Sequence, residues 1–149
     1  MIAALGVCLV VLGAWASVTD VRRRVIPNLC CVLVATCGLV LQVARAFWEV
    51  FAGSVPPPAL CLVTAAGVAV VGASAELIAR RVAGRAFVGL GDVKYVAAWA
   101  CMLGPLVFYG LVVACLAGAA CAIARRTRTF PMAPWLTVAF FVVGAAALI

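Results

Sequence analysis

The acidic side chains are the residues in this sequence whose type could do chemistry. The chain has no histidine, and its acids are Asp20, Glu49, Glu76 and Asp92. Two carboxylates held about 3 Å apart cannot both ionise, so such a pair shares one proton. The ionised carboxylate can take a proton from a water while the protonated one hydrogen-bonds a peptide carbonyl, which is general acid–base hydrolysis. This chemistry requires two of the four acids to meet in the fold.

Asp20 and Asp92 could meet, because each lies at the edge of a long apolar run. Asp20 closes the first run, and an acid at the C-terminal end of a helix opposes the helix dipole, so Asp20 does not stabilise its own helix. Asp92 opens a later run, where it could be no more than an acidic N-cap. Asp20 could likewise be a surface residue that pairs with nearby arginines. The residues alone leave a catalytic pair and these structural roles open.

The two glutamates fit ordinary helix ion pairs. Arg45 lies four residues before Glu49, and Glu76 lies four before Arg80, a spacing that places each pair on one helix face. Glu76 lies in the inner part of an apolar helix, where an ionisable group is costly and often functional. A polar contact near the active face is therefore the alternative for Glu76.

The elements that carry these acids are apolar enough to require a membrane. Of the 149 residues, 69% are hydrophobic and 10% are charged, whereas a soluble domain has about a quarter charged residues. Apolar runs of roughly 18 or more residues predict membrane-spanning helices. The runs are Ile2 to Thr19, Leu29 to Ala44, Ala59 to Ala75, Val93 to Ile123 and Met132 to Ile149.

The fourth run is too long for a single span and contains Gly104 and Pro105. A proline removes a backbone donor and breaks or kinks a helix. We therefore expect one helix from Val93 to about Leu103 and a second from about Pro105 to Ala124, which gives about six spans in total.

The basic residues orient these spans. Cytoplasmic loops of membrane proteins are enriched in Lys and Arg. With the N-terminus outside, every basic residue except Arg45 falls inside. The sequence thus predicts an all-α integral membrane protein, one domain over residues 1–149, with both termini outside and Asp20 and Asp92 at its cytoplasmic rim. The net charge of +7 then needs no nucleic-acid partner, and the arginines at 22–24 are topology signals and anionic-lipid contacts.

Metal and cofactor sites are not expected. The eight cysteines lie in apolar segments, none in a CxxC pair, and the chain has no histidine. Zinc sites are built from Cys and His at characteristic spacings. Small apolar packing residues are the simpler interpretation of the cysteines.

The stretch around Asp92, "GLGDVK", has two further features. Gly89 and Gly91 would let the backbone take positive φ and would let another backbone, such as that of a peptide substrate, approach closely. Alternatively, they only shape the turn before the helix. Lys94 could hold Asp92 or line the site, or it could be one more inside-facing positive charge.

Three stretches of the sequence resemble the signatures of the prepilin peptidases, the GxGD-type aspartic membrane proteases of bacteria. "TDVRRRVIPN" (19–28) is similar to the first signature and "GLGDVK" (89–94) to the second. "FPMAPWL" (130–136) resembles the start of the last helix in that family, and departs from it at Met132 and Ala133. The resemblance covers nearly the whole chain.

The resemblance implies a function. Asp20 and Asp92 would be the catalytic pair of a metal-independent endopeptidase that cuts the basic leader from prepilins or pseudopilins at the cytoplasmic face of the inner membrane. The chain would be a short form without the methyltransferase domain, like those that serve Flp/Tad-type pili. Among the other motif residues, Pro27 would fit the first turn of the second helix. Asn28 would cap that helix or hydrogen-bond the loop that positions Asp20.

Other functions are compatible with the same residues. A presenilin-like protease of other substrates usually has Tyr before its first Asp, whereas Thr19 precedes Asp20 here. A small ion or proton carrier would place its acids near the middle of the membrane, whereas Asp20 and Asp92 are predicted at the rim. An inactive scaffold of a pilus assembly machine is the third alternative.

Overall fold

The computed structural model describes residues 2–48, 56–84, 89–126 and 130–147, and all their regular structure is helical. The all-α expectation is confirmed. The helices are α1 (Ile2–Arg23), α2 (Asn28–Trp48), α3 (Pro58–Ala83), α4 (Leu90–Leu103), α5 (Val107–Ala124) and α6 (Ala133–Ala146), and a short 3-10 turn, η1 (Gly104–Leu106), joins α4 to α5.

The helices differ in whether they are long and apolar enough to span a membrane. Three helical stretches of the described residues are long and apolar enough to span one, namely Ala4–Arg23, Pro58–Val82 and Leu90–Ala124. Asn28–Ala44 and Ala133–Ala146 form shorter apolar helices. Counted this way, the described part of the chain has five apolar helical segments, and the longest of them is interrupted.

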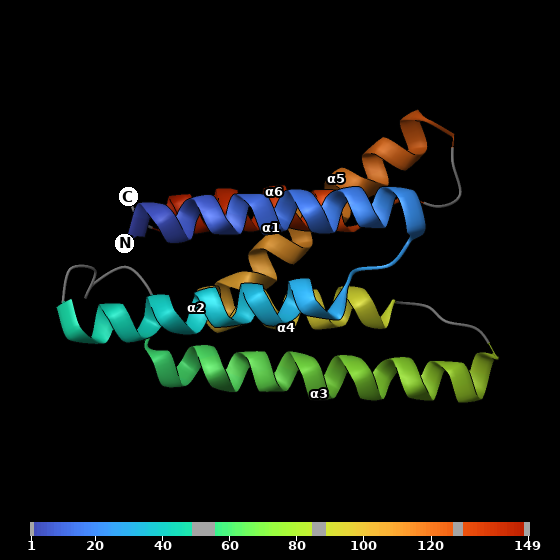
Figure 1. Cartoon of the computed structure of the whole chain (residues 1–149). Coiled ribbons are helices and arrows are strands. Elements are labelled where there is room, and N and C mark those ends of the chain that lie inside the picture. Colours follow the sequence, from blue (N-terminus) through green and yellow to red (C-terminus); the bar gives the residue numbers. More distant parts are fainter. Residues whose placement is uncertain (1, 49–55, 85–88, 127–129, 148–149) are drawn as a thin grey trace.

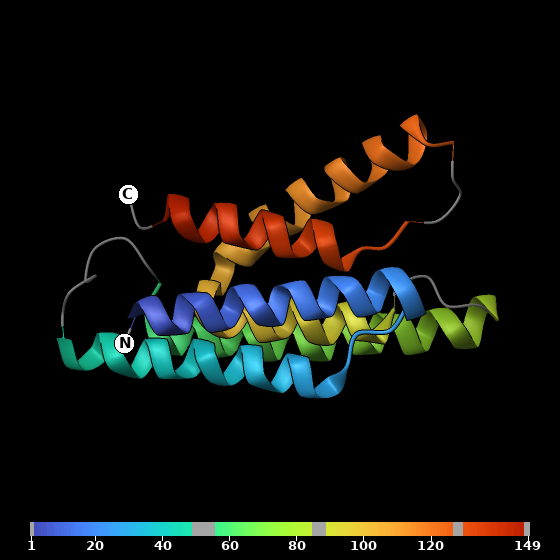
Figure 2. The same cartoon turned by 45° about the horizontal axis from the view of Figure 1, so that its top comes forward.

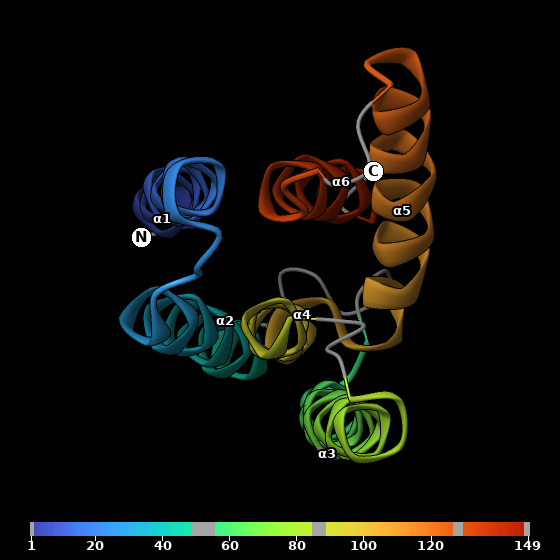
Figure 3. The same ribbon diagram turned by 90° about the vertical axis from the view of Figure 1, so that its right-hand side faces the viewer.

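That interruption is the predicted break at Gly104 and Pro105. Gly104 has φ +55°, and a Cβ there would lie 3.0 Å from Cys61 Sγ, so a larger residue would be strained in both backbone and packing. In Figure 3 the other helices are seen nearly end-on while α5 runs across the view, so the chain changes direction sharply at η1. The division of the long run is confirmed, although α4 begins at Leu90 and not at Val93.

All the helices except α5 lie lengthwise beside one another, with α1 and α3 running in one direction and α2, α4 and α6 in the other (Figure 1). The beginning of α1 and the end of α6 share one end of this bundle, as the turned view in Figure 2 also shows. The other end holds the last turn of α1 and the first turns of α4 and α6. Asp20 and Asp92 therefore belong to the same end of the molecule.

Glycines allow the helices to approach closely. A Cβ at Gly72 in α3 would lie 2.6 Å from Val93 Cγ1 in α4, and a Cβ at Gly118 in α5 would overlap the ring of Phe130. Gly67 has no atom within 4 Å of its Cβ position. Small residues at such contacts are typical of helix pairs in lipid, where there is no hydrophobic force between helices.

The expected helix ion pair of α3 is confirmed. Arg80 Nε donates to Glu76 Oε1 at 2.6 Å, and the Glu76 side chain is buried. The second expected pair is not described, because Glu49 lies outside the described residues.

Candidate active site

Asp20 lies in the last turn of α1 and is buried, with 7% of its surface exposed. Its Oδ2 accepts a hydrogen bond of 2.9 Å from the backbone N–H of Ala133, the first residue of α6. An anion is unfavourable at the end of its own helix and favourable at the N-terminus of another. The carboxylate that α1 disfavours is thus held by α6.

The alternative of a surface Asp20 paired with arginines is wrong. Arg22, Arg23 and Arg24 are exposed, while Asp20 is turned into the bundle. The chain leaves α1 at Arg24, which has φ +54° and donates its N–H to Asp20 O at 2.9 Å. This bond closes the helix and directs the following loop towards α2.

Asp92 is the third residue of α4, so the alternative that it is the N-cap is also wrong. The N-cap is Gly89. In the first turn, Asp92 still benefits from the positive end of the helix dipole. The side chain is half-buried, and its carboxylate is close enough to that of Asp20 for the two negative charges to repel each other. The two acids are therefore neighbours, although they come from α4 and α1.

The glycines around Asp92 do not adopt positive φ, so that part of the expectation is wrong. Gly89 has φ −67°, and Gly91 is not among the positive-φ glycines of the described chain. A Cβ on Gly89 would lie 3.0 Å from Asp92 Oδ2, so Gly89 leaves room for the carboxylate. A Cβ on Gly91 would lie 3.5 Å from Ile26 Cβ and 3.6 Å from Ile26 N. The backbone that approaches Gly91 is thus part of the same chain.

Lys94 contacts the first signature, and no ion pair joins it to Asp92 in the part of the chain that the structure describes. Its Nζ donates to Asn28 Oδ1 at 3.2 Å, in an exposed position. Asn28 is the first residue of α2, and its side-chain oxygen is used for this contact with α4. Pro27 precedes the helix and does not lie in its first turn as expected; its carbonyl accepts from Cys31 N at 3.3 Å.

The three signature stretches therefore meet at one end of the bundle. Ile26 and Asn28 of the first contact Gly91 and Lys94 of the second. Asp20 of the first contacts Ala133 of the third through the backbone. Because Ala133 contributes its N–H and not its side chain, the departure from the family pattern at this position leaves the contact intact.

Sequence reasoning missed a group of three hydroxyl side chains, those of Ser17, Tyr95 and Thr137. Tyr95 lies one turn from Asp92, and Thr137 lies one turn from Ala133. Tyr95 Oη lies 2.8 Å from Thr137 Oγ1, which also contacts Ala133 O at 2.8 Å. Ser17 Oγ, in α1, lies 3.5 Å from Thr137 Oγ1. The available signal was the position of Tyr95 one turn after Asp92, but a tyrosine in an apolar run is an ordinary core residue.

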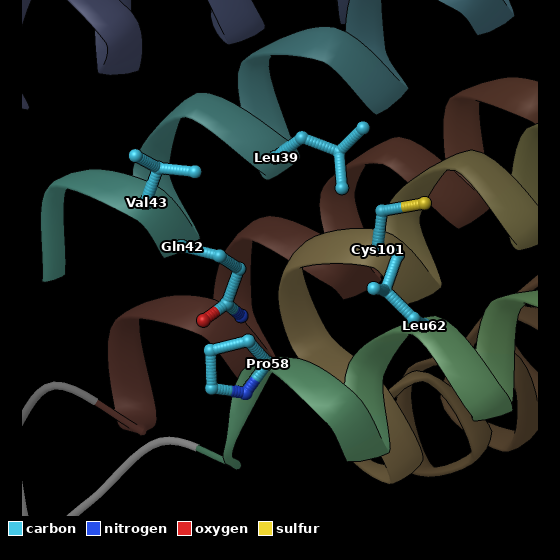
Figure 4. Close-up of a pocket in the computed structure, with 6 residues that line it drawn as sticks. All are labelled: Leu39, Gln42, Val43, Pro58, Leu62 and Cys101. Atoms are coloured by element: carbon cyan, nitrogen blue, oxygen red, sulfur yellow. The ribbon is translucent and has the colours of Figure 1, made fainter. Parts of the chain in front are cut away.

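An apolar cavity of about 160 Å³ lies between α2, α3 and α4, towards the opposite end of the bundle. Figure 4 shows its lining residues, which are Leu39, Gln42, Val43, Pro58, Leu62 and Cys101. The amide of Gln42 is buried and donates to Met102 O at 3.0 Å, in the last turn of α4, where carbonyls lose intrahelical partners. The cavity carries no carboxylate, so it is not the site of the predicted hydrolysis.

Nothing in the described part of the chain forms a metal site of the usual kind. No group of three or more Cys, Asp or Glu side chains gathers there, and the described cysteines are free. Cys30 and Cys31 are buried in α2 as packing residues.

Comparisons with known proteins agree with the resemblance in the sequence. The model of the type IV leader peptidase family matches residues 7–123, a range that includes both Asp20 and Asp92. Neither the curated proteins nor the solved structures gave a significant match. Since the family model covers most of the chain, the protein belongs to the type IV leader peptidase family, the aspartic-type prepilin peptidases of the inner membrane.

Proposed function

We propose that this protein removes the basic leader peptide from prepilins or pseudopilins of the Flp/Tad type, with Asp20 and Asp92 as the catalytic pair. The observation that carries the proposal is the neighbourhood of two carboxylates from distant parts of the chain, one of them buried at the N-terminus of α6. Family membership supplies the reaction class, and the Flp/Tad substrate class is the finer part of the proposal, tested separately below.

In the proposed reaction a water lies between the two carboxylates, which share one proton. The ionised carboxylate takes a proton from the water, and the oxygen of the water forms a bond to the scissile carbonyl carbon. The protonated carboxylic acid hydrogen-bonds the carbonyl oxygen. The peptide C–N bond then breaks, and the new amine receives the proton. Asp92 is half-buried, so substrate and water would reach the pair from its side.

The proposed topology has six spans with both termini outside, which places the acids at the cytoplasmic rim. The break at η1 and the common end of the first and last helices support an even number of crossings. The exposed arginines of the α1–α2 loop and of the end of α5 support the sidedness. In this proposal the basic leader is cut on that face, just ahead of the apolar segment of the substrate.

Co-expression with a prepilin tests the function. We expect Asp20→Asn and Asp92→Asn each to leave the prepilin unprocessed, with cleavage reduced by about 10²-fold or more, since each change removes general acid–base catalysis. Glu49→Gln serves as the matched control, because that acid is predicted on the outer face. Mature pilin at the normal rate with either aspartate variant would exclude the catalytic pair and would favour a scaffold or carrier.

The substrate class is tested by presenting one enzyme with two prepilins. A small Flp-type prepilin and a longer type IV prepilin, each with a Gly before the apolar segment, are cleaved in the same membranes. We expect the Flp-type leader to be removed faster. Equal or slower cleavage of the Flp-type leader contradicts the substrate assignment and leaves the family reaction untouched.

A further inference from the structure

A buried hydrogen-bond chain runs from α4 to the first residue of α6. The Thr137 hydroxyl lies 2.8 Å from Ala133 O and 2.8 Å from Tyr95 Oη. A threonine hydroxyl has one hydrogen, and in this geometry it is donated to the Ala133 carbonyl. The Tyr95 hydroxyl is then the donor to Thr137 Oγ1. Both side chains are buried, and Tyr95 is fully so.

The two ends of this hydrogen-bond chain lie in the helix turns that carry Asp92 and hold Asp20. Tyr95 follows Asp92 by one turn of α4, and Thr137 follows Ala133 by one turn of α6. Ala133 in turn donates its N–H to Asp20 Oδ2 at 2.9 Å. The contact between Tyr95 and Thr137 therefore links the turn that carries Asp92 to the turn that holds Asp20.

We propose that Tyr95 and Thr137 are positioning residues that fix Asp20 and Asp92 relative to each other. The inference rests on the proposed role of Asp20 and Asp92. Neither hydroxyl touches the substrate in this proposal. Both fix the position of Ala133, whose N–H holds Asp20.

The surrounding contacts between α4 and α6 show why a directional link is needed. Trp99 packs against Phe140 and Phe141 with ring centroids 5.6 and 5.1 Å apart. Aromatic pairs of this kind are favourable over centroid separations of about 4.5–7 Å, so they tolerate a small shift of one helix along the other. A hydrogen bond between two hydroxyls loses strength over a few tenths of an ångström. It can therefore fix the register of α4 against α6, which the aromatic contacts do not.

Two conservative variants test the proposal in the full-length enzyme. Tyr95→Phe and Thr137→Val each remove one hydroxyl and keep most of the side-chain volume. We expect kcat for cleavage of a prepilin to fall by about tenfold or more, since small misplacement of catalytic groups has effects of this size. KM should stay within about twofold. Thr137→Ser, which keeps the hydroxyl, should recover most of the kcat.

The double variant adds a second readout. If both hydroxyls act through one link, Tyr95→Phe combined with Thr137→Val should lower kcat about as much as either change alone. If the two changes were unrelated packing defects, their fold-decreases in kcat would multiply in the double variant. That result overturns the proposal.

Matched controls are available on exposed helix faces. Tyr109→Phe removes the hydroxyl of an exposed tyrosine in α5, and Thr36→Val removes an exposed threonine hydroxyl that bonds Val32 O within α2. Both should keep the kcat of the wild type. The folded fraction of every variant is measured by its elution as a monodisperse species in detergent, and kcat is expressed per folded molecule.

The outcomes separate this proposal from the proposed function. If Asp20→Asn and Asp92→Asn are inactive while Tyr95→Phe keeps the kcat of the wild type, the positioning proposal fails and the catalytic pair stands. If loss of activity follows only loss of folded protein, or if Thr137→Ser is as impaired as Thr137→Val, the hydroxyls are structural and the proposal fails. If the aspartate variants cleave normally, the proposed function itself fails.

Discussion

Asp20 is predicted to have two separable roles, one in cleavage and one in holding the start of α6. Two substitutions separate them. Asp20→Asn removes the ionisable group but keeps a side-chain oxygen that can accept from Ala133 N–H. Asp20→Ala removes both. Both variants should fail to process a prepilin, and only the alanine variant should lose substantial stability.

The magnitudes follow from the contact. The bond between Asp20 Oδ2 and Ala133 N is 2.9 Å long and buried. Leaving a buried N–H without a partner costs about 1–3 kcal/mol. For Asp20→Asn, losing the anion at a helix N-terminus costs about 0.3–1 kcal/mol, or up to ~2 when partly buried. The neutral Asn is not repelled by Asp92 and does not bury a charge, and both effects offset part of that loss. We therefore expect a change within about 1 kcal/mol for Asn and about 2–3 kcal/mol of destabilisation for Ala.

The free energy of unfolding is measured by SDS titration of the purified protein in mixed micelles, alongside prepilin cleavage in membranes. Wild type and Asp92→Asn are the references. Equal stability of the alanine and asparagine variants would show that the contact with Ala133 does not hold α6, and the structural reasoning would be wrong. An active asparagine variant would refute the catalytic role.

Two further predictions concern helix contacts. Gly72→Ala should lower cleavage several-fold and cost about 1–3 kcal/mol of stability, because its Cβ would lie 2.6 Å from Val93 Cγ1, next to Asp92; Gly67→Ala, on an open face of α3, is the control and should be neutral. Cys8 and Cys37, whose sulfurs lie 3.8 Å apart, should form an intramolecular disulfide with a lipid-soluble oxidant, detected by mass spectrometry after alkylation. Equal effects of the two glycine variants, or no such disulfide, would contradict the described packing.

The break of the long apolar run could be predicted because its causes are local. Pro105 lacks a backbone donor whatever surrounds it, and the structure ends α4 at Leu103 as expected. The ion pair between Glu76 and Arg80 was predictable for the same reason, since the helix itself sets the spacing. The first residue of α4 was misplaced by three positions, because Gly89 caps the helix and not Asp92.

The roles of the motif residues could not be predicted, because they depend on neighbours from other helices. Gly91 was expected to make room for a substrate, and it lies against Ile26. Lys94 was expected to hold Asp92, to line the site or to be one more inside-facing positive charge; its side chain is exposed, and its contact with Asn28 was not foreseen. These contacts join stretches that are far apart in the sequence, and no local pattern encodes them.

The sequence by itself determined the setting: a chain without histidine that requires a membrane, with Asp20 and Asp92 at the ends of apolar runs. Its composition and spacing are enough for these conclusions, because burial in lipid and helix periodicity are properties of the residues themselves. Only the tertiary structure decided how Asp20 is held. The carboxylate opposes the dipole of its own helix, and the N-terminus of α6, which begins more than a hundred residues later, supplies the N–H that stabilises it. That partner exists only once α1 and α6 have packed together.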